Sequence, residues 1–315
     1  MVGWNNSDTE DPLFILKGFP GLEYVHSWLS IPFCLAYLVA LIGNGTILCV
    51  VWFESSLHQP MYYFLSILAL TDLGMSLSTL PTMLAVLWLN VQEIQASACY
   101  AQLFFIHMFT FLESSVLLAM AFDRFIAICR PLHYTTILTN GVIVKIGLAC
   151  LLRSMGVVLP TPLLLQRYHY CRINALSHAF CLHQDVLKLS CSDAQVNSVY
   201  GLCVVIVTLG VDSVFILFSY VLILNAVLGI ASREERRKAL NTCVSHISVV
   251  LIFFVPVIGV SMVHRFGKHL SSTVHIFMAD IYLLLPPVLN PIVYSVRTKQ
   301  IRLGILRKFG VRRNH

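Results

Sequence analysis

Long apolar stretches alternate with short polar segments along almost the whole chain. Turn and charge signals separate the stretches, such as ESSLHQP after the first and SREERRK after the fifth. A helix of about 20 apolar residues crosses a bilayer. Seven stretches reach that length, at residues 28–53, 60–88, 99–129, 142–165, 197–230, 239–263 and 272–295. The pattern predicts an all-α membrane protein, built as a bundle of seven transmembrane helices.

Composition supports a membrane environment. Hydrophobic residues make up 57% of the 315 positions, and charged residues only 11%. Soluble domains carry about 25% charged residues, so this chain has too few charges to cover a water-exposed surface. The first residues, MVGWNNSDTEDP, lack the basic segment and short apolar run of a signal peptide. We therefore expect the first span to act as its own insertion signal.

Basic residues are unevenly distributed between the two sets of loops. The richer set, with the C-terminal segment, carries Arg130, Arg233, Arg236, Arg237, Lys238, Arg297, Lys299, Arg302, Arg307, Lys308, Arg312 and Arg313. Such loops stay in the cytoplasm, and an odd number of spans then places the N-terminus outside. We expect a multi-pass plasma-membrane protein with residues 1–27 extracellular, 28–295 in the transmembrane domain and 296–315 cytoplasmic. The net charge of +6 reflects this asymmetry and does not indicate nucleic-acid binding.

Two features fit the predicted outer side. Asn5-Asn6-Ser7 is a glycosylation sequon in the N-terminal segment. Four of the ten cysteines fall on the same side, where disulfides persist; they are Cys99, Cys171, Cys181 and Cys191. Four cysteines allow three connectivities, and free thiols are the alternative.

Several charged residues lie inside or at the end of the apolar stretches. Asp72 and Glu113 are in mid-span, where a carboxylate is costly and functional by default. Two such carboxylates either share a proton through a hydrogen bond or hold a cation, because hard cations prefer oxygen ligands. Asp123 and Arg124 end the third stretch, where Arg124 could simply anchor the helix at the interface. Arg153 also lies deep, and no partner for it is evident from the sequence.

Motifs in fixed order resemble those of the odorant receptors, which belong to the rhodopsin-like G-protein-coupled receptors. They are AMAFDRFIAIC followed by PLHY, PMYYFLSILALTD in the second span, KALNTCVSHI in the sixth and LNPIVYSVR in the seventh. The segments LKGFPGLE and CRINALSHAFCLHQDVLKLSC resemble the class I (fish-like) odorant receptors, and most nearly their family 51. The resemblance covers the chain from about Phe14 to Arg302.

This resemblance implies a receptor rather than an enzyme. A small odorant would bind from outside and activate a stimulatory, olfactory-type G protein that raises cyclic AMP. A short amphipathic eighth helix would follow the seventh span. The switch residues that the resemblance implies are Asp123, Arg124, His246, Pro291 and Tyr294. Phe125 departs from the tyrosine found at this place in many rhodopsin-like receptors, which puts any step needing that hydroxyl in doubt.

The resemblance also implies specific pairs and an ion. The disulfides would be Cys99–Cys181, which ties the third span to the second outer loop, and Cys171–Cys191, which closes that loop on itself. The allosteric cation would be sodium, which favours the inactive state. Its site would be formed by Asp72, Glu113, Asn44 and Asn290.

The ligand site that the resemblance implies lies near the outer ends of the third, fifth and sixth spans. Class I receptors are associated with small carboxylic acids, and SMVHRFG matches their acid-anchoring arginine, here Arg265. The alternative for Arg265 is an interfacial position or a pair with Asp280, and for the other residues it is helix packing. The expected ligand contacts are His107, Met108, Phe111, Val158, Gln184, Gly201, Val205, Ser261 and Arg265.

Three alternative functions remain open. One is a metabolite-sensing receptor outside the nose, because the site of expression is not written in the sequence. A transporter or channel would show a continuous path of charges or two matched halves, and the deep charges Asp72, Glu113, Arg153 and Asp212 form no repeat. A seven-span enzyme should show a catalytic His/Asp or Ser/His set, and none is evident.

Overall fold

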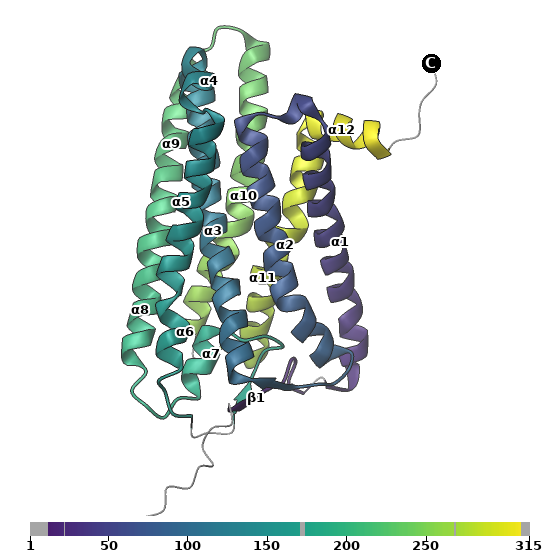
Figure 1. Cartoon of the computed structure of the whole chain (residues 1–315), viewed down its shortest axis with the longest axis vertical. Coiled ribbons are helices and arrows are strands. Elements are labelled where there is room, and N and C mark those ends of the chain that lie inside the picture. The colour runs from purple at the N-terminus through teal and green to yellow at the C-terminus, as the bar shows by residue number, and fades with distance from the viewer. Residues whose placement is uncertain (1–11, 22, 171–173, 268, 310–315) are drawn as a thin grey trace, which may run out of the picture.

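The structure is a computed structural model that describes residues 12–21, 23–170, 174–267 and 269–309. Within them, seven helical stretches are long and apolar enough to cross a membrane. Two of these are divided, the fourth into α5 and α6 and the fifth into α8, the turn η4 and α9. The bounds are α1 His26–Phe53, α2 Pro60–Leu87, α3 Ala96–Cys129, α5 Asn140–Val158, α6 Pro160–Leu165, α8 Gln195–Val205, η4 Ile206–Gly210, α9 Val211–Leu228, α10 Arg233–Phe266 and α11 Ser272–Arg297. The predicted seven-helix bundle is confirmed (Figure 1).

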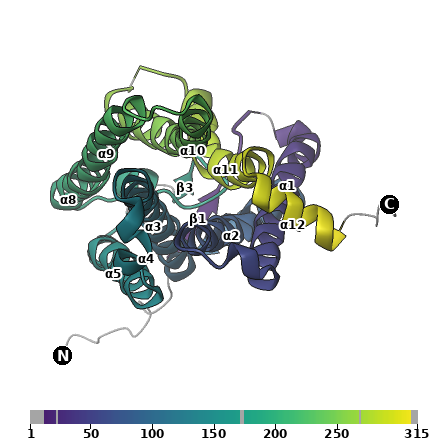
Figure 2. The ribbon, with the colours of Figure 1, turned by 90° about the horizontal axis from the view of Figure 1, so that it is seen from above.

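An additional helix, α12 (Lys299–Phe309), follows α11 and turns away from the bundle axis at the end opposite the strands (Figures 1 and 2). One face of α12 packs on α1. Ile301 is fully buried, and Gly304 lies so close to Val50 that an added Cβ would come within 2.6 Å of its side chain. Arg307 pairs with Glu54 across 3.2 Å at the exposed edge. This arrangement is the short amphipathic eighth helix that the sequence led us to expect.

A small sheet that the sequence did not indicate lies at the other end of the bundle. Its strands are β1 (Leu13–Leu16), β2 (Glu93–Gln95) and β3 (Ala175–Leu176), in the order β2-β1-β3. β1 is antiparallel to β2 and parallel to β3. Phe14 points inward from β1 and is fully buried against the rings of Tyr100 and Tyr170. The sheet therefore ties three distant segments together, and we call this end of the molecule the sheet end.

Short elements complete the described chain. They are η1 Glu23–Val25, η2 Ser55–Leu57, η3 Pro131–His133, α4 Tyr134–Ile137 and α7 His183–Lys188.

The sixth span starts earlier than its apolar stretch. We predicted a start at residue 239, but α10 begins at Arg233. The Ser232 side chain caps the helix by accepting a hydrogen bond from the Glu235 backbone N–H. Glu234 and Lys238, four residues apart, form an ion pair of 2.8 Å on the exposed face. These local polar contacts extend the helix beyond the part that hydropathy detects.

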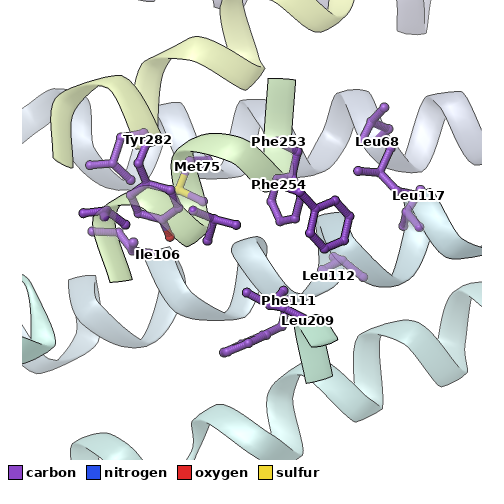
Figure 3. Close-up of a cluster of buried hydrophobic side chains, with 14 of the residues drawn as sticks. Leu68, Met75, Ile106, Phe111, Leu112, Leu117, Leu209, Phe253, Phe254 and Tyr282 are labelled. Carbon is purple, nitrogen blue, oxygen red and sulfur yellow. The ribbon is translucent and has the colours of Figure 1, made fainter. Parts of the chain in front are cut away.

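The centre of the bundle is built around α3, which packs against α2, α5, α9 and α10 (Figure 2). In the most apolar part of α3, 72% of residues are buried, against 17% for the α5–α6 segment. The latter helix therefore faces mainly lipid. A cluster of aliphatic and aromatic side chains from α2, α3, α10 and α11 fills the middle of the bundle (Figure 3). Phe253 and Phe254 of α10 pack edge to face there, with ring centroids 5.0 Å apart.

Candidate ligand-binding site

A cavity of about 100 Å³ lies between the spans toward the sheet end. Segments from α3, α5, α6, α8, η4, α10 and α11 form its wall, and Leu182 with the first two residues of α7 covers it. Its lining residues are His107, Thr110, Phe111, Val157, Val158, Thr161, Leu182, His183, Gln184, Gly201, Val204, Val205, Leu209, Val257, Val260, Ser261, His264, Arg265 and Tyr282.

The structure brings together eight of the nine expected ligand contacts around this cavity. Met108 differs: it is buried but does not line the cavity. On a helix, Met108 projects at an angle to its neighbour His107, so only one of the two points into the space. The cavity is also lined by residues that were not expected, among them Thr110, Thr161, His183, Leu209 and Tyr282. Ligand contact itself stays a prediction for all of them.

Two polar side chains of the wall, Ser261 and Arg265, lie together on α10. Ser261 donates its hydroxyl to the Val257 carbonyl of its own helix, at 2.8 Å, and keeps its oxygen lone pairs. Arg265 is half-buried one turn further along α10 and forms no ion pair within the described residues. The alternative pairing with Asp280 is therefore not observed. The cavity thus has a free guanidinium at one end and mostly apolar walls elsewhere.

The loop over the cavity is held by a disulfide and a buried amide. Cys99 at the start of α3 is bonded to Cys181, as expected. Gln102, one turn along α3, accepts a hydrogen bond of 2.8 Å from the Cys181 backbone N–H through its Oε1. Its Nε2 donates to the Ser78 carbonyl and to the Thr82 hydroxyl, each at 2.8 Å. Gln102 therefore fixes the loop to both α2 and α3, a role that no sequence motif revealed.

Two other predictions concern residues outside the described part of the chain. Cys171 and Asn5 both fall there, so the Cys171–Cys191 disulfide and the glycosylation of Asn5 stay predictions.

His183 joins the loop to the fifth span. Its Nε2 donates to Oδ1 of the buried Asn197 at 3.1 Å, and its ring lies edge-on to His107 with centroids 6.2 Å apart. Burial lowers the pKa of His183 to about 4; the hydrogen bond with Asn197 opposes this shift, and the charge of Arg265 adds to it. His183 is therefore a neutral hydrogen-bonding group near pH 7.

We expect the melting temperature of the purified protein to fall as the pH is lowered from about 6.5 to about 4. His183 takes up a proton near pH 6.5 in the unfolded chain but only near 4 when folded. The unfolded state binds more protons in this window, so the free energy of unfolding decreases as the pH falls. The His183→Gln variant keeps a donor for Asn197 but does not titrate. Its melting temperature should depend less on pH, and identical slopes would contradict the assignment.

A second histidine cluster lies beside the cavity and shares His264 with its wall. The buried His178 bonds through Nδ1 to Asp185, which also pairs with Lys188 at 2.9 Å. Burial alone would raise the pKa of Asp185, but its contacts with His178 and Lys188 outweigh burial and hold the pKa below its usual range. The His178 ring stacks on that of His264, with centroids 5.8 Å apart. This cluster fastens α7 to the outer part of α10.

The two mid-span carboxylates meet at the centre of the bundle. The Asn290 amide donates to Asp72 at 3.1 Å and to Glu113 at 3.2 Å, and all three side chains are 1–2% exposed. Oδ1 of Asn290 is buried and accepts no hydrogen bond from any residue that the structure describes. Carboxylate and amide oxygens suit a hard cation, so these residues fit sodium. Asn44 is placed differently, because its amide donates to the carbonyls of Ala40 and Pro287.

The residues expected to form the switch lie toward the α12 end. Arg124 and Asp123 approach within 3.0 Å, and Tyr134 donates to the fully buried Asp123 at 2.7 Å. His246 of α10 bonds to the Tyr220 hydroxyl at 2.6 Å. The expected switch residues on α11 are also buried, where the Tyr294 hydroxyl points to the sulfur of Met120, 3.9 Å away, and Pro291 lies against Gly43.

The architecture is similar to that of a solved seven-helix membrane protein. The fold matches the crystal structure of squid rhodopsin with a TM-score of 0.75 at 19% identity, over 91% of this chain and 86% of that one. This likeness shows that the chain has the seven-helix fold of rhodopsin.

The family follows from sequence comparison. A family model described as olfactory receptor matches residues 33–311. Human olfactory receptor 51L1 is 84% identical over 313 residues, which is 99% of each chain. Human olfactory receptor 51G2 is 58% identical over 97% of each chain. The chain belongs to the olfactory receptor family, and it is a G-protein-coupled receptor rather than an enzyme.

Proposed function

We propose that this receptor detects a small carboxylic acid that enters from outside the cell. The observation that carries the proposal is Arg265, a half-buried guanidinium on the cavity wall without an ion-pair partner in the described chain. Guanidinium groups form two parallel hydrogen bonds to a carboxylate. Ser261 lies on the same helix face, four residues away, and its hydroxyl can donate to the carboxylate when it turns from the Val257 carbonyl.

The remaining wall suits a short hydrocarbon tail. Phe111, Val158, Val205 and Leu209 line it on three sides. The volume is about 100 Å³, which is smaller than an apolar cavity of about 150 Å³ that holds benzene. We therefore infer a preference for short-chain acids over long ones.

Signalling would follow from a difference in affinity between two states. An acid that binds the active state more tightly shifts the population toward it, and only that difference matters. α10 would then move outward at the α12 end, Arg124 would leave Asp123, and a stimulatory olfactory-type G protein would dock and raise cyclic AMP. The loops rich in basic residues support a cytoplasmic location for this end, with the N-terminus outside the plasma membrane.

The test is a cyclic-AMP assay in cells that express the full chain at the surface. The panel runs from acetic to dodecanoic acid, with the alcohol and the aldehyde of each chain length. We expect responses to acids that peak at a short chain length. Responses confined to alcohols would remove the acid proposal, and cyclic AMP that stays flat while another second messenger rises would remove the stimulatory G protein.

We further propose that sodium bound by Asp72, Glu113 and Asn290 stabilises the inactive state. Bound there, the ion would offset one of the two negative charges and reduce the repulsion between the carboxylates that share one amide group. Replacing sodium in the assay buffer with a large organic cation should raise agonist potency in the parent receptor but not in Asp72→Asn. Asp280→Asn, which removes another buried carboxylate of the bundle, is the matched control and should keep the sodium effect. Equal sodium dependence in all three proteins would argue against the site.

A further inference from the structure

A polar cluster joins three spans in the middle of the bundle. Nη1 of Arg153 on α5 lies 2.9 and 3.1 Å from the two carboxylate oxygens of Asp212 on α9, and 3.0 Å from the Ser115 hydroxyl on α3. The neighbouring Ser114 donates to Asp212 at 2.7 Å. The sequence placed Arg153 deep in the membrane without a partner; the structure supplies several, including the Thr208 carbonyl at 3.4 Å.

Arg153 lies where a charged side chain is energetically costly. α5 faces mainly lipid, and the Arg153 side chain keeps 34% of its surface exposed, whereas Asp212 is almost completely buried. An arginine in the hydrocarbon region is expensive and usually marks a functional position. None of the parts of the receptor described above uses this pair.

The register of the three helices places the cluster directly beside the cavity. Each helix carries a cavity-lining residue and a cluster residue three or four positions apart. On the regular helices α3 and α5 the spacing of four puts both on the same face, about one turn of 5.4 Å from each other. The pairs are Val157 with Arg153 on α5, Phe111 with Ser115 on α3, and Leu209 with Asp212 in the fifth span. In all three the cluster residue is the one nearer the α12 end. The cluster therefore forms a layer beneath the cavity floor.

The fifth span is not a regular α-helix at this level. Residues Ile206–Gly210 form the π-turn η4, a widened turn that often occurs at functional sites. Arg153 Nη2 donates to the carbonyl of Thr208 in this turn, and the next residue, Leu209, is part of the cavity wall. One guanidinium thus holds both the turn and the carboxylate that follows it.

We propose that Arg153 and Asp212 are positioning residues for the ligand cavity. Their ion pair holds η4 in place, so that Leu209 closes the inner end of the cavity and limits the length of the ligand tail. The effect on tail length rests on the proposed function, whereas the placement of Leu209 does not depend on any ligand.

The direct test is the chemical accessibility of the cavity floor in the full-length receptor. Leu209→Cys is introduced, the purified receptor is exposed to a small water-soluble methanethiosulfonate, and modification at position 209 is followed by peptide mass spectrometry. This readout separates the introduced thiol from the natural free cysteines. We expect slow modification in this parent and a several-fold faster rate after Arg153→Met with Asp212→Asn. The paired replacement leaves no unpaired buried charge. The asparagine introduced at position 212 can still accept the hydrogen bond from the Ser114 hydroxyl.

Two controls separate positioning from general loosening. Val260→Cys reports on the same cavity from α10, which in the described chain gives no hydrogen bond to Arg153 or Asp212, and its modification rate should be unchanged by the paired replacement. Arg153→Lys retains the charge but loses the fork that reaches both Asp212 and the Thr208 carbonyl, so the thiol at position 209 should react at an intermediate rate. Equal rates at position 209 in the parent and the paired variant would overturn the proposal, and so would a rise at both positions.

The cyclic-AMP assay adds the consequence for selectivity. With position 209 as leucine, the paired variant should respond to longer acids than the parent does. An unchanged length preference together with faster labelling at position 209 would overturn the role in selectivity and leave the positioning role standing. If the parent receptor does not respond to any acid, only the proposal of an acid ligand is refuted. The labelling experiment does not need an agonist, so its result would still stand.

Discussion

Arg265→Ala is expected to remove most or all of the response to carboxylic acids while surface expression stays near the parent level. Hydrogen bonds to charged groups contribute about 1.5–3 kcal/mol, so the concentration for half-maximal response should rise about 10- to 100-fold. Expression should survive because Arg265 makes no ion pair within the described residues, and its loss leaves no partner charge uncompensated. Dose–response curves for the best acid and its matched alcohol check the prediction.

The control variants separate anchoring from the general charge of the outer surface. Arg167→Ala removes a positive charge from an exposed site at the same end of the molecule, outside the cavity, and should leave the response intact. Arg265→Lys keeps the charge but loses the planar fork, so an intermediate loss is expected. If Arg167→Ala weakens the response as much as Arg265→Ala, the arginine acts by attracting anions to the surface. If acids act equally well on all three variants, the salt-bridge model fails.

The spans were predictable because lipid imposes a simple rule on sequence. A helix that crosses a bilayer needs a long apolar run, and such runs identified all seven helices, including the start of α2 at Pro60 and the end of α3 at Cys129. The rule does not apply beyond the membrane. There Ser232 and its neighbours extend α10 through capping and ion pairs, and Phe14 is buried through a sheet of very short strands.

The residues of the site could be predicted only where the resemblance to the family implies a role for a particular position. Arg265, Ser261 and Gln184 came from resemblance, and they line one cavity. Gln102 could not be found in this way, because a lone glutamine in a span carries no motif, and its role depends on a backbone N–H contributed 79 residues away. The partners of Arg153 were hidden for the same reason, since they come from two other helices and from a π-turn that has no sequence signature.

Asp123→Asn is expected to raise cyclic AMP in the absence of any agonist, by several-fold over the parent receptor. Asp123 is fully buried and lies 3.0 Å from Arg124. Losing the carboxylate charge removes the attraction that favours the resting position of the guanidinium. Asparagine still accepts the hydrogen bond from Tyr134, so the local packing is retained. The measurement is basal cyclic AMP per receptor at the surface, compared with the parent and with Arg124→Ala, which should give no signal above untransfected cells.

Tyr134→Phe decides which contact of Asp123 restrains the receptor. It removes the 2.7 Å hydrogen bond but leaves the ion pair in place, so basal activity should rise less than with Asp123→Asn. If Tyr134→Phe is the more active variant, the restraint lies in the link between α3 and the segment that follows it. If neither variant raises basal activity at normal surface expression, Asp123 and Arg124 only anchor the helix end. In that case the restraint on α10 must come from other contacts, of which the Tyr220–His246 hydrogen bond is the nearest candidate on that helix.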